Sequence, residues 1–292
     1  MKVLLTGRGG QLGQALLRTK PASWDVVATS RKELDLSDAA ACEQAVYTIR
    51  PDWVLNAGAY TAVDKAESEP ELAHAINADA PRAFARALNN TGGRLLQVST
   101  DFVFSGNQGK PYTPNAQIEP LGVYGRTKAA GEKAAMNELA AGRLSILRTS
   151  WVYGPVGKNF LLTMLRLHDS KAKAGDSLSV VSDQVGCPTS TLTLAEASWA
   201  VITRGVDGIH HWCDAGAASW YDFALAIGEL GVQHGLLSQS ACVKAIPSVA
   251  YPTPARRPYY SLLDCVDTRK ATGLEGVHWR NALNVVFKLL AQ

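Results

Sequence analysis

Tyr124 and Lys128 form the one pair in the chain in which a lysine follows a tyrosine by four positions. Residues four apart on a helix lie on the same face, so the phenol and the ammonium would be neighbours. An adjacent ammonium lowers the pKa of a phenol from about 10 towards neutrality, because it stabilises the phenolate. Such a phenol can donate a proton to the alkoxide that forms when a ketone accepts hydride. We therefore predict Tyr124 as a general acid and Lys128 as its partner.

A second polar group, Ser99-Thr100-Asp101, ends the apolar segment that begins at Leu95. This segment is predicted to form a strand, and the carboxyl ends of parallel strands meet at one edge of a sheet. We expect the Thr100 hydroxyl to lie at that edge beside the Tyr124 phenol, which makes Thr100 the third predicted catalytic residue.

A glycine-rich turn follows the first apolar segment of the chain. Gly7, Gly10 and Gly13 are spaced three apart, and a helical pattern begins at Gln11. The start of a helix presents unpaired N–H groups and a partial positive charge, and glycines let a pyrophosphate approach that backbone closely. The position at the first strand-to-helix junction favours a dinucleotide site over a turn that only packs the helix on the sheet.

The end of the second predicted strand bears on which dinucleotide binds. An acidic residue there would accept hydrogen bonds from the adenosine ribose and repel a 2′-phosphate, but this chain has Thr29-Ser30-Arg31-Lys32. We therefore predict a preference for NADPH, with NADH also possible. The alternative is that Arg31 and Lys32 are solvated loop charges. Asp35 and Leu36, just downstream, are expected to meet the adenine.

Small residues follow the third predicted strand, from Asn56 to Thr61. They would let the backbone pass close to the ribose and the nicotinamide, although a simple packing turn is the alternative. The predicted cofactor-binding residues are Gly7, Gly10, Gln11, Leu12, Gly13, Ser30, Arg31, Asp35, Leu36, Ala57, Gly58, Ala59, Tyr60, Thr61, Tyr124 and Lys128.

Short apolar segments alternate with helical patterns in the first half of the chain, which indicates right-handed βαβ units. The predicted fold class is α/β, a Rossmann-type doubly wound parallel sheet with a smaller C-terminal α/β substrate domain. The loop from Phe104 to Leu121 is longer than a simple connection between two elements needs to be, and we expect it to form part of the entrance to a substrate site. The predicted strands are Val3–Leu5, Trp24–Ala28, Trp53–Asn56, Leu95–Ser99 and Ser145–Ser150. The predicted helices are Gln11–Arg18, Ala39–Ile49, Glu71–Asn89 and Tyr124–Leu139.

The alternation loosens after residue 151. We predict a dinucleotide-binding domain over residues 1–151, to which residues 176–208 return, and a substrate-binding domain made mainly of residues 152–175 and 209–292. The elements expected in the second half are the helices Phe160–Leu167, Thr193–Thr203 and Ser219–Leu230, the strand Leu178–Val181 and the extended segment Tyr251–Pro258.

Composition excludes several classes of function. The 292 residues are 47% hydrophobic and 19% charged, with a formal charge of +3 and dispersed basic residues, so nucleic acid is not an expected partner. No stretch reaches the roughly 20 apolar residues that span a bilayer, and the N-terminus is predicted to form a strand and not a signal peptide. We therefore expect a cytoplasmic enzyme without membrane partners. The five cysteines are widely spaced without a CxxC, and the six histidines show no zinc spacing.

Taken together, these motifs resemble the extended short-chain dehydrogenase/reductases, and within them the dTDP-4-dehydrorhamnose reductase family. The strings that carry the closer resemblance span both predicted domains. They are Asn56-Ala57-Gly58-Ala59-Tyr60-Thr61-Ala62-Val63-Asp64-Lys65-Ala66-Glu67, Ser99-Thr100-Asp101-Phe102-Val103-Phe104, Arg148-Thr149-Ser150-Trp151-Val152-Tyr153 and Tyr251-Pro252-Thr253-Pro254-Ala255-Arg256-Arg257-Pro258.

The resemblance implies reduction of the C4 ketone of dTDP-4-dehydro-β-L-rhamnose by NADPH or NADH, the last step of dTDP-L-rhamnose synthesis. Tyr124 would be the proton donor, and Lys128 would tune it and anchor the ribose. The Trp151 indole would offer the sugar a flat apolar face, and Arg256 or Arg257 would pair with the diphosphate. The alternative for the arginines is that they are surface charges. The implied substrate-binding residues are Thr61, Val63, Thr100, Asp101, Tyr124, Trp151, Arg256 and Arg257.

Two departures from related enzymes refine this expectation. Sugar-nucleotide dehydratases carry Thr-Asp-Glu where this chain has Phe102 in the third place, which favours simple reduction over elimination. Some family members hold magnesium across a dimer through acidic residues, one of them on the first helix. The helix Gln11 to Arg18 has no acid, so we predict no metal and a monomer or weak homodimer.

Two other functions remain open from the sequence. A nucleotide-sugar 4-epimerase, or another 4-ketoreductase, would share the fold, but an epimerase usually holds NAD through an acid after the second strand. A non-catalytic dinucleotide-binding subunit, similar to the regulatory β subunit of methionine adenosyltransferase, is the second alternative. An intact Thr100, Tyr124 and Lys128 argue against it.

Overall fold

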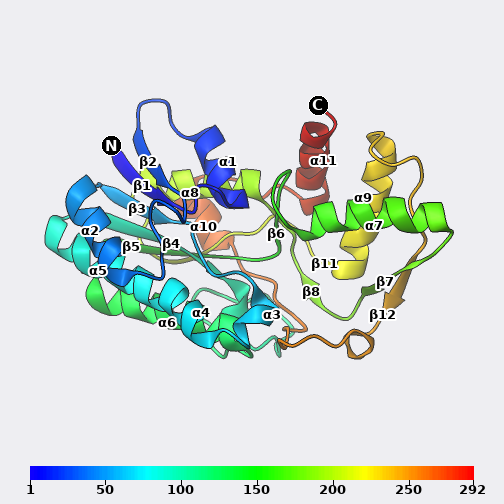
Figure 1. Cartoon of the computed structure of the whole chain (residues 1–292), viewed down its shortest axis with the longest axis horizontal. Coiled ribbons are helices and arrows are strands. Elements are labelled where there is room, and N and C mark those ends of the chain that lie inside the picture. The colour runs from blue at the N-terminus through cyan, green and yellow to red at the C-terminus, as the bar shows by residue number, and fades with distance from the viewer.

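A six-stranded parallel sheet forms the centre of the first of two lobes in the computed structural model, which describes residues 1–292 (Figure 1). The chain steps outward from the first strand to the second and then returns to the opposite side at the third. This reversal creates a crevice at the carboxyl ends of the strands. The predicted α/β fold class is confirmed. In spatial order the strands are β10 (Gly208–His211), β5 (Leu144–Thr149), β4 (Arg94–Thr100), β3 (Trp53–Asn56), β1 (Lys2–Thr6) and β2 (Asp25–Thr29).

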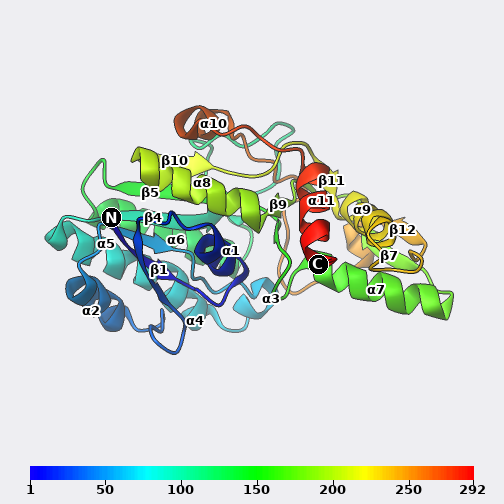
Figure 2. The same ribbon diagram turned by 90° about the horizontal axis from the view of Figure 1, so that it is seen from above.

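Helices cover both faces of this sheet (Figure 2). Successive strand side chains point to opposite faces, so Val3 and Leu5 pack under one helical layer and Leu4 packs under the other. All three side chains are fully buried, which explains why the strands are apolar throughout rather than alternating. The first layer consists of α1 (Gln11–Thr19) and α8 (Thr191–Arg204), with α10 (Val266–Thr272) beside α8. The second layer consists of α2 (Ala39–Ile49), α5 (Ala80–Thr91) and α6 (Val123–Glu138).

The single long helix predicted near Glu71–Asn89 is interrupted by one π-helical turn. The segment runs as α4 (Pro70–His74), the π turn η1 (Ala75–Asp79) and α5, with Pro70 at the first turn of α4 and Pro81 at that of α5. Single π turns in helices occur frequently at functional sites. A short helix, α3 (Val63–Ala66), precedes this segment.

The second lobe is built from three helices and short paired strands around its own apolar core (Figure 1). Phe223 and Phe287 are fully buried in that core. The helices are α7 (Phe160–Ala174), α9 (Trp220–Gln233) and α11 (Trp279–Leu290). The strand pairs are β7 (Leu178–Val181) with β12 (Val243–Ile246), β8 (Val185–Gly186) with β11 (Ala218–Ser219), and β6 (Val152–Tyr153) with β9 (Thr189–Ser190). Two 3₁₀ turns, η2 (Asp101–Val103) and η3 (Ser248–Ala250), complete the elements.

Strand pairing and helix packing differ from the predicted domain boundaries in both directions. β7, β8 and β9 were expected in the first domain but pair with β12, β11 and β6 in the second lobe. β10 and α10 lie within the expected substrate domain, yet β10 is the edge strand of the large sheet and α10 packs on α8 and β10. Pairing partners of this kind are distant in sequence, so local pattern does not reveal them.

Two segments of the second half differ from the expectation in length or form. Helix α7 continues to Ala174 and ends at Gly175, whose φ of 70° closes it in the left-handed conformation. An ion pair from Asp169 to Lys173 accompanies this polar extension. The segment Tyr251–Pro258 has no regular secondary structure. No helix in the structure combines the length and the apolar character needed to cross a membrane.

Helix α6 packs so closely on the π turn that Gly131 is required there. A Cβ at position 131 would overlap the carbonyl oxygen of Asn77. Gly131→Ala should therefore lower the free energy of unfolding by about 1–3 kcal/mol, as expected for overpacking. Urea unfolding followed by circular dichroism measures this. Gly109→Ala is the control, because nothing lies within 4 Å of a Cβ at that position; equal loss in both variants would contradict the close packing.

Candidate active site

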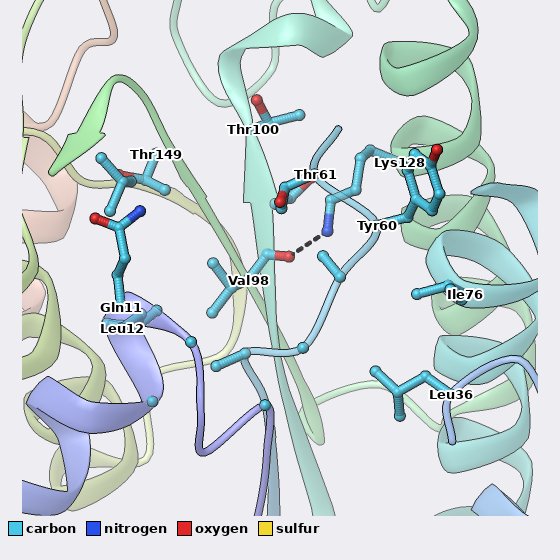
Figure 3. A pocket seen from close by; sticks show the side chains of 18 of the residues that line it. Gln11, Leu12, Leu36, Tyr60, Thr61, Ile76, Val98, Thr100, Lys128 and Thr149 are labelled. Atoms are coloured by element: carbon cyan, nitrogen blue, oxygen red, sulfur yellow. Dashed lines mark hydrogen bonds between the residues drawn. The ribbon is translucent and has the colours of Figure 1, made fainter. Parts of the chain in front are cut away.

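One pocket of about 780 Å³ lies at the carboxyl ends of the sheet strands (Figure 3). Its size is that of a small-molecule or cofactor site. Twenty of the sequence-predicted site residues line it. They are Gly7, Gly10, Gln11, Leu12, Gly13, Ser30, Arg31, Asp35, Leu36, Ala57, Gly58, Ala59, Tyr60, Thr61, Val63, Thr100, Asp101, Tyr124, Lys128 and Trp151.

The glycine-rich turn brings two backbone segments into direct contact. Gly7 has a φ of 73°, and a Cβ on it would lie 2.8 Å from Cα of Gly58. A Cβ on Gly13 would overlap the carbonyl oxygen of Gly7. Gly10 caps helix α1 without any side-chain hydrogen bond, so the first N–H groups of α1 face the pocket without a side-chain partner. The residues present therefore fit a pyrophosphate group.

Polar side chains at the end of β2 are engaged with one another. The Ser30 N–H and hydroxyl both donate to Oε2 of Glu33 at 2.7 Å, and Oε1 of Glu33 pairs with Arg8 at 3.2 Å. Arg31 is 71% exposed and lies 3.4 Å from Oδ2 of Asp35. Asp35 also accepts from the Ser37 N–H and hydroxyl, and these bonds hold its pKa below the usual value. Arg31 is thus tethered at the pocket rim while remaining open to solvent.

The π turn η1 joins the loop after β3 to helix α6. The Asn77 side chain accepts from the Tyr60 N–H at 2.9 Å and donates to the Tyr60 carbonyl at 3.1 Å. It also donates to the Thr127 hydroxyl at 3.1 Å. Ile76 of the same turn lines the pocket (Figure 3). Asn77 therefore ties two walls of the pocket together.

Thr100 and Asp101 sit where β4 passes into the turn η2. The Thr100 hydroxyl donates to Oδ1 of Asp101 at 3.0 Å and accepts from the Phe102 N–H at 3.2 Å. Asp101 is 1% exposed, and its Oδ2 has no hydrogen-bond partner. Burial raises the pKa of Asp101 to about 6. This carboxyl is thus half-protonated near pH 6 and mostly ionised at neutral pH.

Tyr124 and Lys128 extend from the first turns of α6 into the pocket. Lys128 is buried and its Nζ donates to the Val98 carbonyl at 2.7 Å (Figure 3). Burial lowers the pKa of Lys128 to about 8, and the charge of Glu132 opposes this shift. Both groups lie in the same cleft as Thr100, as the sequence predicted.

The pKa of Tyr124 differs from the sequence expectation. Its removal from water, opposed by the Thr100 hydroxyl and aided by the Asp101 carboxylate, raises the pKa of Tyr124 to about 12. The ammonium of Lys128 points to the Val98 carbonyl instead, and its lowering effect on the phenol is not found. Tyr124 therefore holds its proton at neutral pH.

Trp151 lines the pocket with a backbone φ of 47°, which is rare for a residue with a large side chain. Its indole stacks on Trp220, with ring centroids 3.5 Å apart and planes 3° apart. A Cβ on Gly186 would lie 2.6 Å from the Trp151 ring. One face of the indole is therefore covered by Trp220 of the second lobe, and the contact of the indole with a sugar remains a prediction.

Arg256 and Arg257 do not line the pocket. Arg257 donates to both carboxylate oxygens of Asp64, at 2.8 and 3.1 Å, and Asp64 also accepts from the Ala255 N–H. These bonds hold the pKa of Asp64 below its usual value. Arg256 is exposed. The Arg257 guanidinium is thus paired with Asp64 from helix α3, and a contact of either arginine with the diphosphate remains a prediction.

Comparison with known proteins assigns the chain to a family. Residues 1–292 match the family described as the RmlD substrate binding domain. The chain belongs to this family. The resemblance predicted from the four strings is thereby confirmed.

Individual relatives of this RmlD family chain agree over nearly its whole length. A dTDP-4-dehydrorhamnose reductase of Escherichia coli (strain K12) is 41% identical over 273 residues, which cover 90% of this chain and 89% of the relative. The crystal structure of a reductase of that name from Clostridium acetobutylicum superposes with a TM-score of 0.92, at 35% identity and full coverage of both chains. A structure of the Bacillus anthracis reductase in complex with NADP gives 0.89, at 32% identity and 99% coverage of both.

Several pocket residues of this RmlD family chain escaped prediction. Thr149 ends β5, and Ser150 and Val152 come just after it; this position at another strand end is a signal that could have identified them. Ile76 and Leu194 come from helices, where apolar residues are expected in the core, so the sequence gives no signal for them. The remaining unpredicted lining residues are Gly9, Leu34, Ala62, Val98, Ser99, Phe102 and Lys158.

The predicted absence of a metal and the predicted monomer or weak homodimer remain predictions. The structure contains no group of three or more His, Cys, Asp and Glu side chains suited to a metal ion.

The buried Asp101 carboxyl should make stability depend on pH in a defined direction. Its folded-state pKa of about 6 lies above the unfolded value, so its charge costs stability above pH 6, and the cost disappears as the pH falls towards 4. Asp101→Asn should therefore stabilise the protein more at about pH 7.5 than at about pH 4.5, with a difference of roughly 1–3 kcal/mol. Urea unfolding at the two pH values measures it.

The exposed residue Asp25 provides the control for this comparison. Asp25→Asn should show little difference between the two pH values, because a solvated carboxylate pays no burial cost. If Asp101→Asn behaved in the same way, the buried carboxyl would not be the source of the pH dependence.

Proposed function

We propose that this chain is a dTDP-4-dehydrorhamnose reductase, which reduces the C4 ketone of dTDP-4-dehydro-β-L-rhamnose to the alcohol of dTDP-L-rhamnose. The observation that carries the proposal is the convergence of Thr100, Tyr124 and Lys128 on one pocket with a glycine-lined helix start. The names of relatives at 35–41% identity support the same substrate.

The reaction adds one hydride and one proton to a carbonyl group. A nicotinamide cofactor, when bound, supplies the hydride to C4. The Tyr124 hydroxyl donates its proton to the C4 oxygen, so that the ketone becomes a secondary alcohol and the phenol becomes a phenolate. A pKa of about 12 means that the proton is present on Tyr124 before the reaction begins. Solvent then returns a proton to the phenolate.

Lys128 and Thr100 support this proton transfer. In this structure Lys128 donates to the Val98 carbonyl and does not lower the pKa of Tyr124. We assign it to stabilising the phenolate after its ammonium turns from that carbonyl towards Tyr124 in the complex with cofactor and substrate. Because the Lys128 pKa is about 8, the ammonium form predominates at neutral pH. The Thr100 hydroxyl is fixed by Asp101 and the η2 backbone, and we assign it to hydrogen bonding of the ketone oxygen and the phenol.

The residue after Asp101 favours reduction over elimination. Phe102 contacts the Tyr124 ring edge to face, with centroids 5.5 Å apart, and offers no carboxylate. Removal of water from a sugar requires a base for the ring proton and an acid for the leaving hydroxyl. With an apolar side chain at this place, protonation by Tyr124 is the chemistry that the pocket supports.

NADPH is the proposed cofactor, with NADH as a slower substitute. The Bacillus anthracis relative is described in complex with NADP. In this chain the end of β2 offers Ser30 and Arg31 to the pocket, and Arg31 is free to turn from Asp35 towards a 2′-phosphate. A guanidinium suits a phosphate because it donates two parallel hydrogen bonds.

The assay that tests the function follows NADPH oxidation with the 4-dehydro sugar generated in situ by a preceding dehydratase and epimerase. Oxidation that requires the epimerised sugar is expected. Tight NADPH binding with no oxidation would contradict the reductase. A dinucleotide retained through purification and recycled without net oxidation would indicate an epimerase.

Replacement of Tyr124 removes the proton donor and little else. Tyr124→Phe should lower kcat by about 10²-fold or more, because general acid catalysis contributes that much. The Kd for NADPH, measured by fluorescence, should change by less than about threefold. Tyr60→Phe is the matched control, since Tyr60 also lines the pocket but hydrogen-bonds Glu69. A wild-type kcat in Tyr124→Phe would exclude it as the acid.

Arg31 should distinguish the two cofactors. Arg31→Ala should raise the KM for NADPH by about 10-fold, the value of one charge-assisted hydrogen bond, and leave the KM for NADH nearly unchanged. Lys32→Ala serves as the control, because Lys32 neighbours Arg31 but does not line the pocket. Equal effects on both cofactors would remove Arg31 from the 2′-phosphate site.

A further inference from the structure

A buried ion pair lies one helical turn beyond Lys128, outside the pocket lining. Tyr124, Lys128 and Glu132 are four residues apart and share one face of α6. The Glu132 and Arg148 side chains are 0% and 1% exposed, and Nη2 of Arg148 lies 2.6 Å from Oε2 of Glu132. Nε of Arg148 donates to the same carboxylate at 3.0 and 3.2 Å. The pair is therefore bidentate and dry.

The Glu132 carboxylate also reaches the strand that carries Thr100. The Ser99 hydroxyl donates to Oε1 of Glu132 in a short hydrogen bond, and Ser99 directly precedes Thr100 in β4. Arg148 belongs to the neighbouring strand β5 and lies opposite Ser99 in the register. One carboxylate thus links the helix that bears Tyr124 and Lys128 to the two strands beneath it.

Arg148 extends the same network to the long loop. Its Nη1 donates to the Pro114 carbonyl at 3.0 Å and lies 3.4 Å from Nε2 of His211, whose Nδ1 lies 3.0 Å from the Tyr112 carbonyl. Burial and the Arg148 charge lower the pKa of His211 to about 3, so the imidazole is neutral. It donates to Tyr112 and accepts from Arg148, which fixes the loop against the sheet.

A buried ion pair is a weak source of stability, because the cost of dehydrating both charges offsets their attraction. Apolar side chains of similar volume would fill the same space at similar stability. Apolar contacts, however, are not directional. The bidentate ion pair and the Ser99 hydrogen bond fix the orientation of α6 and its position along β4. The active site needs that alignment, since small displacements of a proton donor cost large factors in rate.

We propose that Glu132 and Arg148 are positioning residues, which hold Tyr124 and Lys128 of α6 in register with Thr100 of β4 for reduction of the substrate ketone. This inference rests on the proposed function only where its test measures kcat; the hydrogen-exchange test does not depend on that function. Neither residue lines the pocket, so their effect acts through the placement of Thr100, Tyr124 and Lys128.

The test is the double variant Glu132→Met/Arg148→Met, which removes both charges and keeps the volume. It should fold, as judged by circular dichroism, with a kcat reduced roughly 10- to 100-fold. The Kd for NADPH should stay within about threefold of wild type, because the glycine turn lies on other elements. Ser99→Ala, which removes the hydroxyl that links the carboxylate to β4, should give a smaller loss of kcat in the same direction with an unchanged Kd for NADPH.

Val46→Ala is the matched control. Val46 is fully buried in α2 and does not line the pocket, so its loss lowers stability through a cavity without touching the network. It should keep the wild-type kcat. This comparison separates lost stability from lost position.

Amide hydrogen exchange provides a readout that does not need the substrate. Exchange in residues 99–103 and 123–128 should accelerate at least about 10-fold in the double variant, while α1 and α2 stay as in wild type. If the double variant does not fold, Ser99→Ala decides by the same two measurements. A wild-type kcat in the folded variant overturns the proposal, and so does wild-type exchange in both segments. Absence of turnover in the wild-type protein would instead refute the proposed function, and exchange would still decide the role of the pair.

Discussion

A chain of buried side-chain hydrogen bonds runs across β1, β3 and β4 to Lys128, and the shape of the pocket depends on it. Thr6 donates to Asn56 at 2.5 Å, Asn56 to Gln97 at 2.7 Å, and Gln97 to the Val98 carbonyl at 2.8 Å. Lys128 donates to that same carbonyl. A slip of β1, β3 or β4 by one residue would leave these groups unpaired away from water, at a cost of about 1–3 kcal/mol each. Strand register and lysine position are therefore set together.

The same hydrogen-bond chain shapes the cofactor cradle. The Thr6 hydroxyl accepts from the Gly58 N–H at 3.1 Å, which draws the loop after β3 against the glycine turn at Gly7. Leu36 then packs over Gly58, where any Cβ would collide with it. Gly7 and Gly58 must therefore be glycines, because the close packing of their two loops leaves no room for a Cβ. The two loops that line this part of the pocket are therefore within van der Waals distance of each other.

Local patterns in the sequence were sufficient for the fold class and for most of the pocket. The strand ends and the glycine turn can be recognised in the sequence, because at these places the polar or glycine residues directly follow an apolar strand. The edge strand β10, the π turn around Asn77 and the pairing of Arg257 with Asp64 were not predictable, since each depends on partners far away in sequence. The Tyr124 pKa was mispredicted because burial, which dominates it, is a property of the folded state.

The path of the chain limits how the two lobes can be separated. After β5 the chain enters the second lobe through α7, returns for α8 and β10, leaves again for α9, and returns once more for α10 before it ends in α11 (Figure 2). A cut after residue 151 would remove β10 from one edge of the sheet and α8 from one face. The dinucleotide-binding lobe is therefore not a transferable module. A fragment cut after residue 151 is therefore not expected to fold into the complete sheet.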